Sequence, residues 1–155
     1  MFECSFELND QPMSTFKVGT ASFPAFSGYG AYINKRASMC LPNLGPIPTG
    51  SYYIIDRQSG GRLGWLWDQV RGHADRFALY AIDGRMDDQT YCNQVLRGNF
   101  RLHPKTGAGI SQGCITIAEP HNFARIRATL KSSAILSLRA ADGKTLQAYG
   151  KVLVK

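Results

Sequence analysis

The chain has 155 residues, of which 44% are hydrophobic and 19% charged, so it is long enough for one domain with a packed core and is not an intrinsically disordered protein. Its net charge of +7 favours an anionic partner, and by itself fits nucleic acid and a carboxylate-rich bacterial cell wall equally well. The Lys and Arg residues form no dense cluster, and no zinc-finger or RNP-like motif supports nucleic-acid binding.

The N-terminus shows no secretion signal of the common type. Residues 1–10, MFECSFELND, lack a basic region followed by a continuous apolar run, so we expect no Sec signal peptide. No apolar run approaches the roughly 18–20 residues that a membrane span needs. We therefore expect a protein that is made in the cytoplasm, has no membrane span and uses another route for any export.

Short apolar runs bounded by Gly, Pro, Asn and Asp predict a mostly β domain. In the first half of the chain we expect residues 2–8 and 14–19 to form a hairpin. We expect no helix at 23–33, where Pro and Gly are frequent. A loop stiffened by Pro and Gly then leads into a strand at 52–56.

The second half contains the strongest helical pattern, at residues 119–131. Pro120 suits the first turn of this helix, and Phe123, Ile126 and Leu130 fall on one side of it. The other predictions, in chain order, are a helical turn at 64–70, a strand at 76–83, a helix at 87–96, a strand at 99–103 and strands around the turn at 141–144. The whole predicts one mostly β domain, residues 1–155, with one or two short α-helices.

The four cysteines form no C-x-x-C pair, which argues against zinc or thioredoxin-like chemistry. If Cys114 is a working thiol, then Cys4, Cys40 and Cys92 allow at most one disulfide and one free thiol. The alternative is that these three are simply small apolar residues of the core.

The stretch RLHPKTGAGISQGCITI, residues 101–117, contains the candidate catalytic residues His103 and Cys114. A free thiol has a pKa of about 8.5, and an imidazole within about 3 Å can take its proton and activate it. A strand–loop–strand arrangement would bring the two side chains together. The competing interpretation is a buried structural cysteine beside a surface histidine.

The residues around Cys114 suit a reactive turn. Gly113 can adopt a positive φ and turn the thiol outward, and backbone N–H groups at such a bend can form an oxyanion hole. Ser111 can hold the turn through a local hydrogen bond. The carbonyl of Pro104 can orient the imidazole of His103 in place of an Asp carboxylate.

Other candidates have weaker support. Arg101 shares a strand face with His103 and could bind a substrate carboxylate, or it is a solvated strand residue. One of Tyr52 and Tyr53 should face the core, and Trp65 and Trp67 could line a glycan cleft but suit packing better. The two remaining histidines, His73 and His121, are expected at the surface or near a helix cap. Combining either with His103 and Cys114 gives no recognised metal-site spacing, so we expect no metal.

Two motifs together resemble a known family. HPKTGAGISQGCITI resembles the His…[Ser/Thr]-x-Gly-Cys motif of YkuD-type L,D-transpeptidase catalytic domains. GPIPTGSYYI, well upstream, resembles the Pro-x-Gly-x-(aromatic)-x-Ile segment of an early strand in those domains. The short His-to-Cys loop, the RLHP lead-in and the small size are similar to the compact branch that type VI secretion systems deliver as antibacterial effectors.

This resemblance implies a β-sandwich or barrel-like L,D-transpeptidase fold and the peptidoglycan tetrapeptide stem as substrate. Cys114 would attack the carbonyl of the L-centre of meso-diaminopimelate, His103 would act as base and then acid, and Ser111 would hold the turn. The amides of Gly113 and Cys114 would stabilise the oxyanion. D-Ala would leave, and water or a D-amino acid would resolve the thioester.

The sequence departs from the larger family at three positions. Gln112 stands where a second His is common, Thr116 where Asn or Arg is common, and Pro104 where Gly is frequent. Gln112 and Thr116 are therefore the candidates that govern acceptor choice. With Arg101 they make up the candidate substrate-binding residues.

The resemblance also implies a biological setting. It implies no cofactor, no nucleic-acid partner, secretion by type VI components, action in the periplasm of the target bacterium and a cognate immunity protein in the producer. Two other functions stay open: a cysteine peptidase or amidase acting on another peptide, and a non-catalytic basic module that binds the cell wall.

Overall fold

The computed structural model describes residues 1–56, 76–107 and 111–155. The predicted helical turn at 64–70, with Trp65 and Trp67, and also His73 lie outside these residues. Within them the fold is mostly β with one α-helix, as the sequence predicted. None of the helices in the described residues is long and apolar enough to cross a bilayer.

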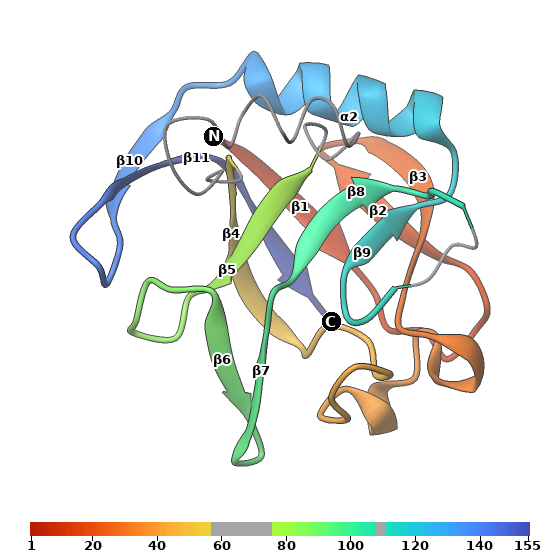
Figure 1. Ribbon diagram of the computed structural model, residues 1–155. Helices are drawn as coiled ribbons and strands as arrows, with labels where there is room; N and C mark the ends of the chain where they lie inside the picture. The colour runs from red at the N-terminus through yellow and green to blue at the C-terminus, as the bar shows by residue number, and fades with distance from the viewer. Residues whose placement is uncertain (57–75, 108–110) are drawn as a thin grey trace.

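A closed, barrel-like sheet forms the body of the molecule (Figure 1). Its strands follow the order β1-β2-β3-β9-β8-β5-β4-β11, and β1 closes the ring by pairing with β11. The pairs β1–β11 and β8–β9 are parallel and the others antiparallel. The bounds are β1 Phe2–Phe6, β2 Ser14–Val18, β3 Ala21–Ser27, β4 Gly50–Asp56, β5 Phe77–Ala81, β8 Arg101–Pro104, β9 Ile115–Ile117, β10 Leu136–Arg139 and β11 Thr145–Val154.

The single described α-helix, α2 (Pro120–Lys131), covers one side of this sheet. Pro120 occupies its first turn, where the missing N–H costs nothing. Phe123, Ile126 and Leu130 are buried in the core that fills the sheet, as their spacing predicted. The helix also contacts β8 and β9, so the core holds in place the two strands that carry His103 and follow Cys114.

The predicted opening hairpin, the strand after the Pro/Gly loop and the two C-terminal strands are confirmed. Of the two tyrosines, Tyr52 is the one that faces the main core, while Tyr53 is half-buried on the other face of β4.

The helix predicted at 87–96 is wrong, since this segment is a hairpin of β6 (Gln89–Cys92) and β7 (Val95–Gly98). Asn93 and Gln94 form its two-residue turn with φ of 46° and 67°. Positive φ at both positions is the geometry of a tight hairpin turn and cannot continue a helix. Asn tolerates that region, whereas Gln does so rarely, so the turn carried little signal in the sequence.

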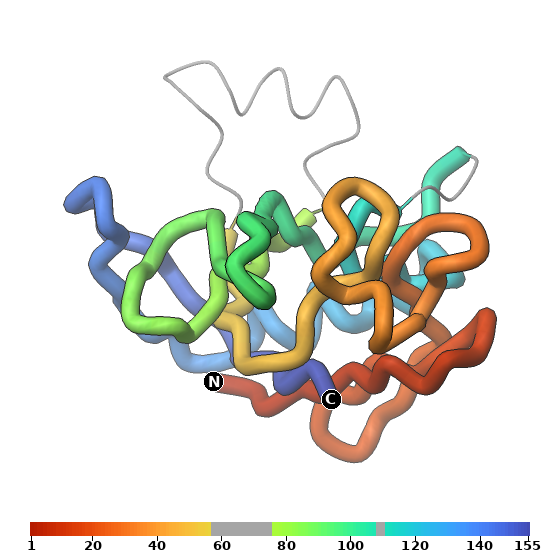
Figure 2. Tube along the Cα trace, turned by 90° about the horizontal axis from the view of Figure 1, so that it is seen from below, coloured from red at the N-terminus to blue at the C-terminus, as the bar shows by residue number. Residues whose placement is uncertain are grey.

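A disulfide between Cys40 and Cys92 fastens this hairpin to the loop that follows two short 3₁₀ turns, η1 (Gly30–Tyr32) and η2 (Arg36–Ser38). Of the two outcomes that the cysteine count left open, the structure has one bridge, with Cys4 buried as a free thiol. Figure 2 shows the hairpin and the loop side by side at the same end of the molecule. Together they form one wall beside the end of β9 that carries Cys114.

Candidate active site

The parallel pair β8–β9 brings the two motif ends together. Leu102 lies opposite Ile115 and His103 opposite Thr116. Side chains alternate along a strand, so Leu102 and Ile115 enter the core while His103 and Thr116 share the other face. Cys114 stands immediately before β9, two residues from Thr116, and is therefore on the face of His103. The spacing of eleven residues thus leaves Cys114 two positions before Thr116, the residue opposite His103.

The His103 imidazole is held by the next residue of its own strand. Its Nδ1 lies 2.7 Å from the carbonyl oxygen of Pro104, the contact that the sequence led us to expect. A carbonyl only accepts, so Nδ1 carries the proton and Nε2 keeps its lone pair as the basic nitrogen. Thr116 Oγ1 lies 3.5 Å from Nε2, and both side chains are buried. Thr116 therefore lies beside the candidate base.

The Cys114 thiol is half-buried at the end of β9. Its Sγ donates a long contact of 3.8 Å to the carbonyl oxygen of Asn99. Among the hydrogen bonds between described residues, none joins Sγ to His103. The thiol and Nε2 must therefore come closer before proton transfer, as is common in a site without substrate.

Both candidate groups are neutral in this environment. Burial lowers the pKa of His103 below its ordinary value of 6.5, and the charge of Arg76 lowers it further, against the contact with Pro104. Burial raises the pKa of the Cys114 thiol, while the backbone N–H of Arg101 and the charges of Arg101 and Arg76 act in the opposite direction. A neutral imidazole and a thiol suit general-base catalysis, in which the proton moves as the sulfur attacks.

Ser111 closes the motif turn, which is formed by residues 111–114. Its buried hydroxyl donates to the carbonyl oxygen of Cys114 at 2.7 Å and accepts from the N–H of Gly28 at 3.4 Å. The turn is thus fixed both to itself and to the loop after β3 (Ala21–Ser27). This is the positioning contact expected of Ser111.

Gly113 has two reasons to be glycine. Its φ is 102°, a conformation that side chains disfavour. A Cβ at this position would also lie 2.7 Å from Arg97 Nη2 and 2.9 Å from the ring of Phe100. The turn that presents the thiol therefore rests directly on Arg97 and Phe100.

Arg97, which the sequence did not single out, is buried beneath this turn. Its guanidinium donates to the carbonyls of Met39, Gly45 (3.2 Å) and Pro46 (3.3 Å) and lies over the Phe100 ring. Two of these carbonyls belong to the upstream GPIPTGSYYI motif, so Arg97 links that motif to the nucleophile's turn. An isolated Arg in a strand has no local signal that predicts this role.

Arg101 lies beside the thiol but has a partner of its own. Its guanidinium binds the Asp88 carboxylate through two contacts, 2.7 and 2.5 Å, and also donates to the carbonyl of Phe100 at 2.8 Å. Gln112, in contrast, is exposed on the motif turn. Of the candidate substrate-binding residues, Gln112 is open to a ligand, Arg101 is held by Asp88, and Thr116 is buried.

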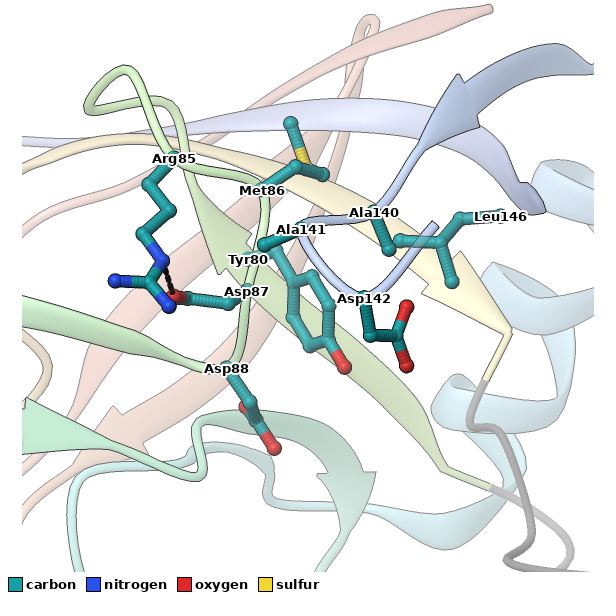
Figure 3. A pocket seen from close by; sticks show the side chains of 9 residues that line it. All are labelled: Tyr80, Arg85, Met86, Asp87, Asp88, Ala140, Ala141, Asp142 and Leu146. Carbon is teal, nitrogen blue, oxygen red and sulfur yellow. Dashed lines mark ion pairs between the residues drawn. The ribbon is translucent and has the colours of Figure 1, made fainter. Parts of the chain in front are cut away.

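A cavity of about 330 Å³ is lined in part by Asp88, the partner of Arg101 (Figure 3). Tyr80, from β5, and Asp142, from the β10–β11 turn, lie next to each other in its wall. Its aspartates Asp87, Asp88 and Asp142 pair with Arg85, Arg101 and Lys144 respectively. Their charges are already matched, so we do not place the reaction there.

A second cavity, of about 190 Å³, lies between the motif turn and the wall formed by the disulfide-linked loop and hairpin. Gln112 and Asn99 contribute to its lining, and the Asn99 carbonyl is the partner of Cys114 Sγ. This cavity therefore adjoins the thiol. No group of three or more His, Cys, Asp or Glu side chains suited to a metal ion occurs in the described ranges.

Comparison with known proteins gives one match. The family model described as the Tlde1 domain matches residues 21–139, which contain both motifs and the whole candidate site. No curated protein and no solved structure matches the chain.

Proposed function

The chain belongs to the Tlde1 domain family, a family of type VI secretion antibacterial effectors, and on this premise we propose that it is a cysteine-dependent enzyme that modifies peptidoglycan. The observation that supports the proposal is the register of β8 and β9, in which His103 lies opposite Thr116, two residues after Cys114, in a chain of this family. We propose one catalytic domain over residues 1–155.

The proposed reaction begins with Cys114. Its Sγ attacks the carbonyl of the L-centre of meso-diaminopimelate in a tetrapeptide stem, and Nε2 of His103 takes the thiol proton. The backbone amides of Gly113 and Cys114 stabilise the oxyanion. The bond to D-Ala then breaks, His103 protonates the departing amine, and a thioester remains on Cys114.

The second half of the reaction decides the product. Water attacking the thioester regenerates the thiol and gives L,D-carboxypeptidase activity, whereas a D-amino acid gives exchange. Gln112 is exposed at the motif turn, so we propose that it contributes to the choice of acceptor. We further propose that the reaction takes place in the periplasm of a target bacterium, and that the producer is protected by an immunity protein.

The test uses purified muropeptides and mass analysis. Loss of D-Ala from tetrapeptides with wild type, and not with Cys114→Ala or His103→Ala, supports the proposal. Wild type, sent to the periplasm by an added signal peptide, should also damage cells while both variants should not. Unchanged muropeptides with toxicity that still requires Cys114 would favour a peptidase or amidase of another substrate. Toxicity retained in Cys114→Ala would reject cysteine catalysis and favour a binding module.

A further inference from the structure

Arg97 is a buried cation whose contacts are all uncharged. The residue is 4% exposed, and its guanidinium meets three backbone carbonyls and an aromatic ring. Among the described residues, no carboxylate is paired with it. Burying a charge without a counter-ion is costly, and buried arginines are normally matched by an anion. The arrangement therefore leaves positive potential unmatched beside the motif turn.

The cavity of about 190 Å³ next to that turn has a lining suited to an anion. Arg97 contributes to its wall, together with the four carboxamide side chains of Asn43, Gln89, Asn99 and Gln112. Carboxamides supply N–H donors, and the lining, which consists of described residues, includes no carboxylate. A volume near that of six water molecules accommodates one small residue with its carboxylate.

The cavity is also correctly placed relative to the thiol. Asn99 belongs to its lining, and the Asn99 carbonyl lies 3.8 Å from Cys114 Sγ. Gln112 precedes the nucleophile by two residues, and Arg97 Nη2 lies beneath Gly113. A group bound in the cavity therefore lies on the side of Cys114 that Asn99 and Gln112 form.

We propose that this cavity is the subsite for the terminal carboxylate of the residue that leaves, and that Arg97 selects substrates by that charge. The inference rests on the proposed function and specifies its substrate. Sγ forms a bond to the carbonyl carbon, the C–N bond breaks, and His103 passes the thiol proton to the nitrogen. The small amino acid then departs with its carboxylate released from the cavity.

The experiment compares two tetrapeptide stems that share one scissile bond. One ends in the free carboxylate and the other in a carboxamide. Hydrogen bonds to charged groups are worth about 1.5–3 kcal/mol, so wild type should prefer the acid by roughly ten-fold or more in kcat/KM. Arg97→Met should lose this preference, and equal cleavage of both stems by wild type would overturn the proposal.

Because Arg97→Met also removes buried hydrogen bonds, a second variant changes the cavity from its rim. Gln89 is exposed and lines the cavity, so Gln89→Glu adds a negative charge there without removing a buried contact. It should raise KM for the acid stem and leave the amide stem unchanged. Gln94→Glu, at the tip of the same hairpin, makes the same charge change outside the lining and should change neither. Equal effects of Gln89→Glu on both stems would contradict the proposal.

A binding measurement separates this inference from the proposed reaction. The two stems are titrated into Cys114→Ala and into Cys114→Ala with Gln89→Glu. If Cys114→Ala binds the acid stem more tightly than the amide stem, and Gln89→Glu abolishes that difference, the subsite is supported. If wild type then cleaves neither stem, only the proposed reaction is rejected. Cleavage of both stems at equal rates rejects the subsite but not the reaction. If neither stem is bound or cleaved, the subsite and the reaction are both rejected.

Discussion

The hydroxyl of Ser111 donates a 2.7 Å hydrogen bond to the carbonyl oxygen of Cys114, closing the turn that presents the thiol. The Oγ of Ser111 also accepts from the N–H of Gly28, so one buried hydroxyl joins the motif turn to a loop 83 residues away in sequence. Both contacts of the Ser111 hydroxyl are therefore to backbone groups. Its contribution to the proposed reaction is therefore the position of Sγ.

Ser111→Ala should lower both stability and turnover. The change leaves the buried N–H of Gly28 and the part-buried carbonyl of Cys114 without their partner, which costs about 1–3 kcal/mol in unfolding free energy. Because the turn is no longer closed, kcat should fall more than KM rises. Urea unfolding and steady-state kinetics check the two effects.

Ser14→Ala is a matched control for this variant. Ser14 is also a buried serine whose hydroxyl donates to a backbone carbonyl, that of Glu7, but it lies on β2 away from the motif turn. It should lose stability to a similar degree and keep its kcat. A kcat loss of the same size in both variants would mean that Ser111 acts only through stability.

The buried His103 should give the protein a characteristic pH dependence. Its folded pKa lies below 6.5, so the neutral imidazole persists to lower pH than in an ordinary histidine. kcat/KM should therefore fall only as the pH passes below 6.5, through the folded pKa. A midpoint above 6.5 would contradict the assignment of His103 as the base.

Stability should change in the same direction. Between the folded pKa of His103 and 6.5 the unfolded chain binds more protons than the folded one, so unfolding free energy rises with pH across that window. His103→Gln should flatten the slope of unfolding free energy below pH 6.5, in the window that the lowered pKa of His103 opens.

The Arg101–Asp88 pair should tune the reactivity of Cys114. The charge of Arg101 lowers the thiol pKa and that of Asp88 raises it. Asp88→Asn should therefore speed alkylation of Cys114 at a fixed pH near 8, and Arg101→Met should slow it. Rates of iodoacetamide labelling followed by mass spectrometry check both signs. Two changes in the same direction would show that the variants act by disturbing the turn instead.

Cys4 serves as the internal control for that labelling. It is buried in the core, and burial raises the pKa of its thiol to about 12. Folded protein should therefore take up one alkyl group, on Cys114, and Cys4 should react only after unfolding.

Local patterns predicted the parts of this molecule that depend on neighbours in the sequence. The helix at Pro120–Lys131 was predictable because its apolar residues repeat at helical spacing and Pro120 marks its start. The contact of His103 with Pro104 joins adjacent residues, and the motif turn spans only Ser111 to Cys114.

The parts that sequence reasoning missed depend on distant partners. Arg97 binds carbonyls 51 to 58 residues away, and nothing near it in sequence distinguishes it from a solvated arginine. The sequence left Arg101 open between a substrate-binding and a solvated residue. In the structure it binds Asp88, which lies next to the β6–β7 hairpin in the segment predicted as a helix. Long-range pairing of this kind leaves no periodic pattern to detect.

The disulfide between Cys40 and Cys92 should matter for both stability and activity. It joins the loop that supplies the Met39, Gly45 and Pro46 carbonyls to the hairpin that carries Arg97. Replacing both cysteines by serine should lower the unfolding free energy by about 2–4 kcal/mol, as loss of a bridge of this span does. Because the loop and hairpin then move independently, Arg97 loses its fixed position beneath Gly113, and activity per folded molecule should also fall.

A reductant should reproduce this effect in wild type and leave the double variant unchanged. Cys4→Ala, which alters a buried thiol outside the bridge, should keep its activity and its sensitivity to reductant. Urea unfolding with and without dithiothreitol measures the stability term, and D-Ala release at a temperature where every variant is folded measures the site. If reduction lowers stability but folded protein retains full activity, the bridge stabilises the chain without positioning Arg97, because a cross-link can act through the unfolded state alone.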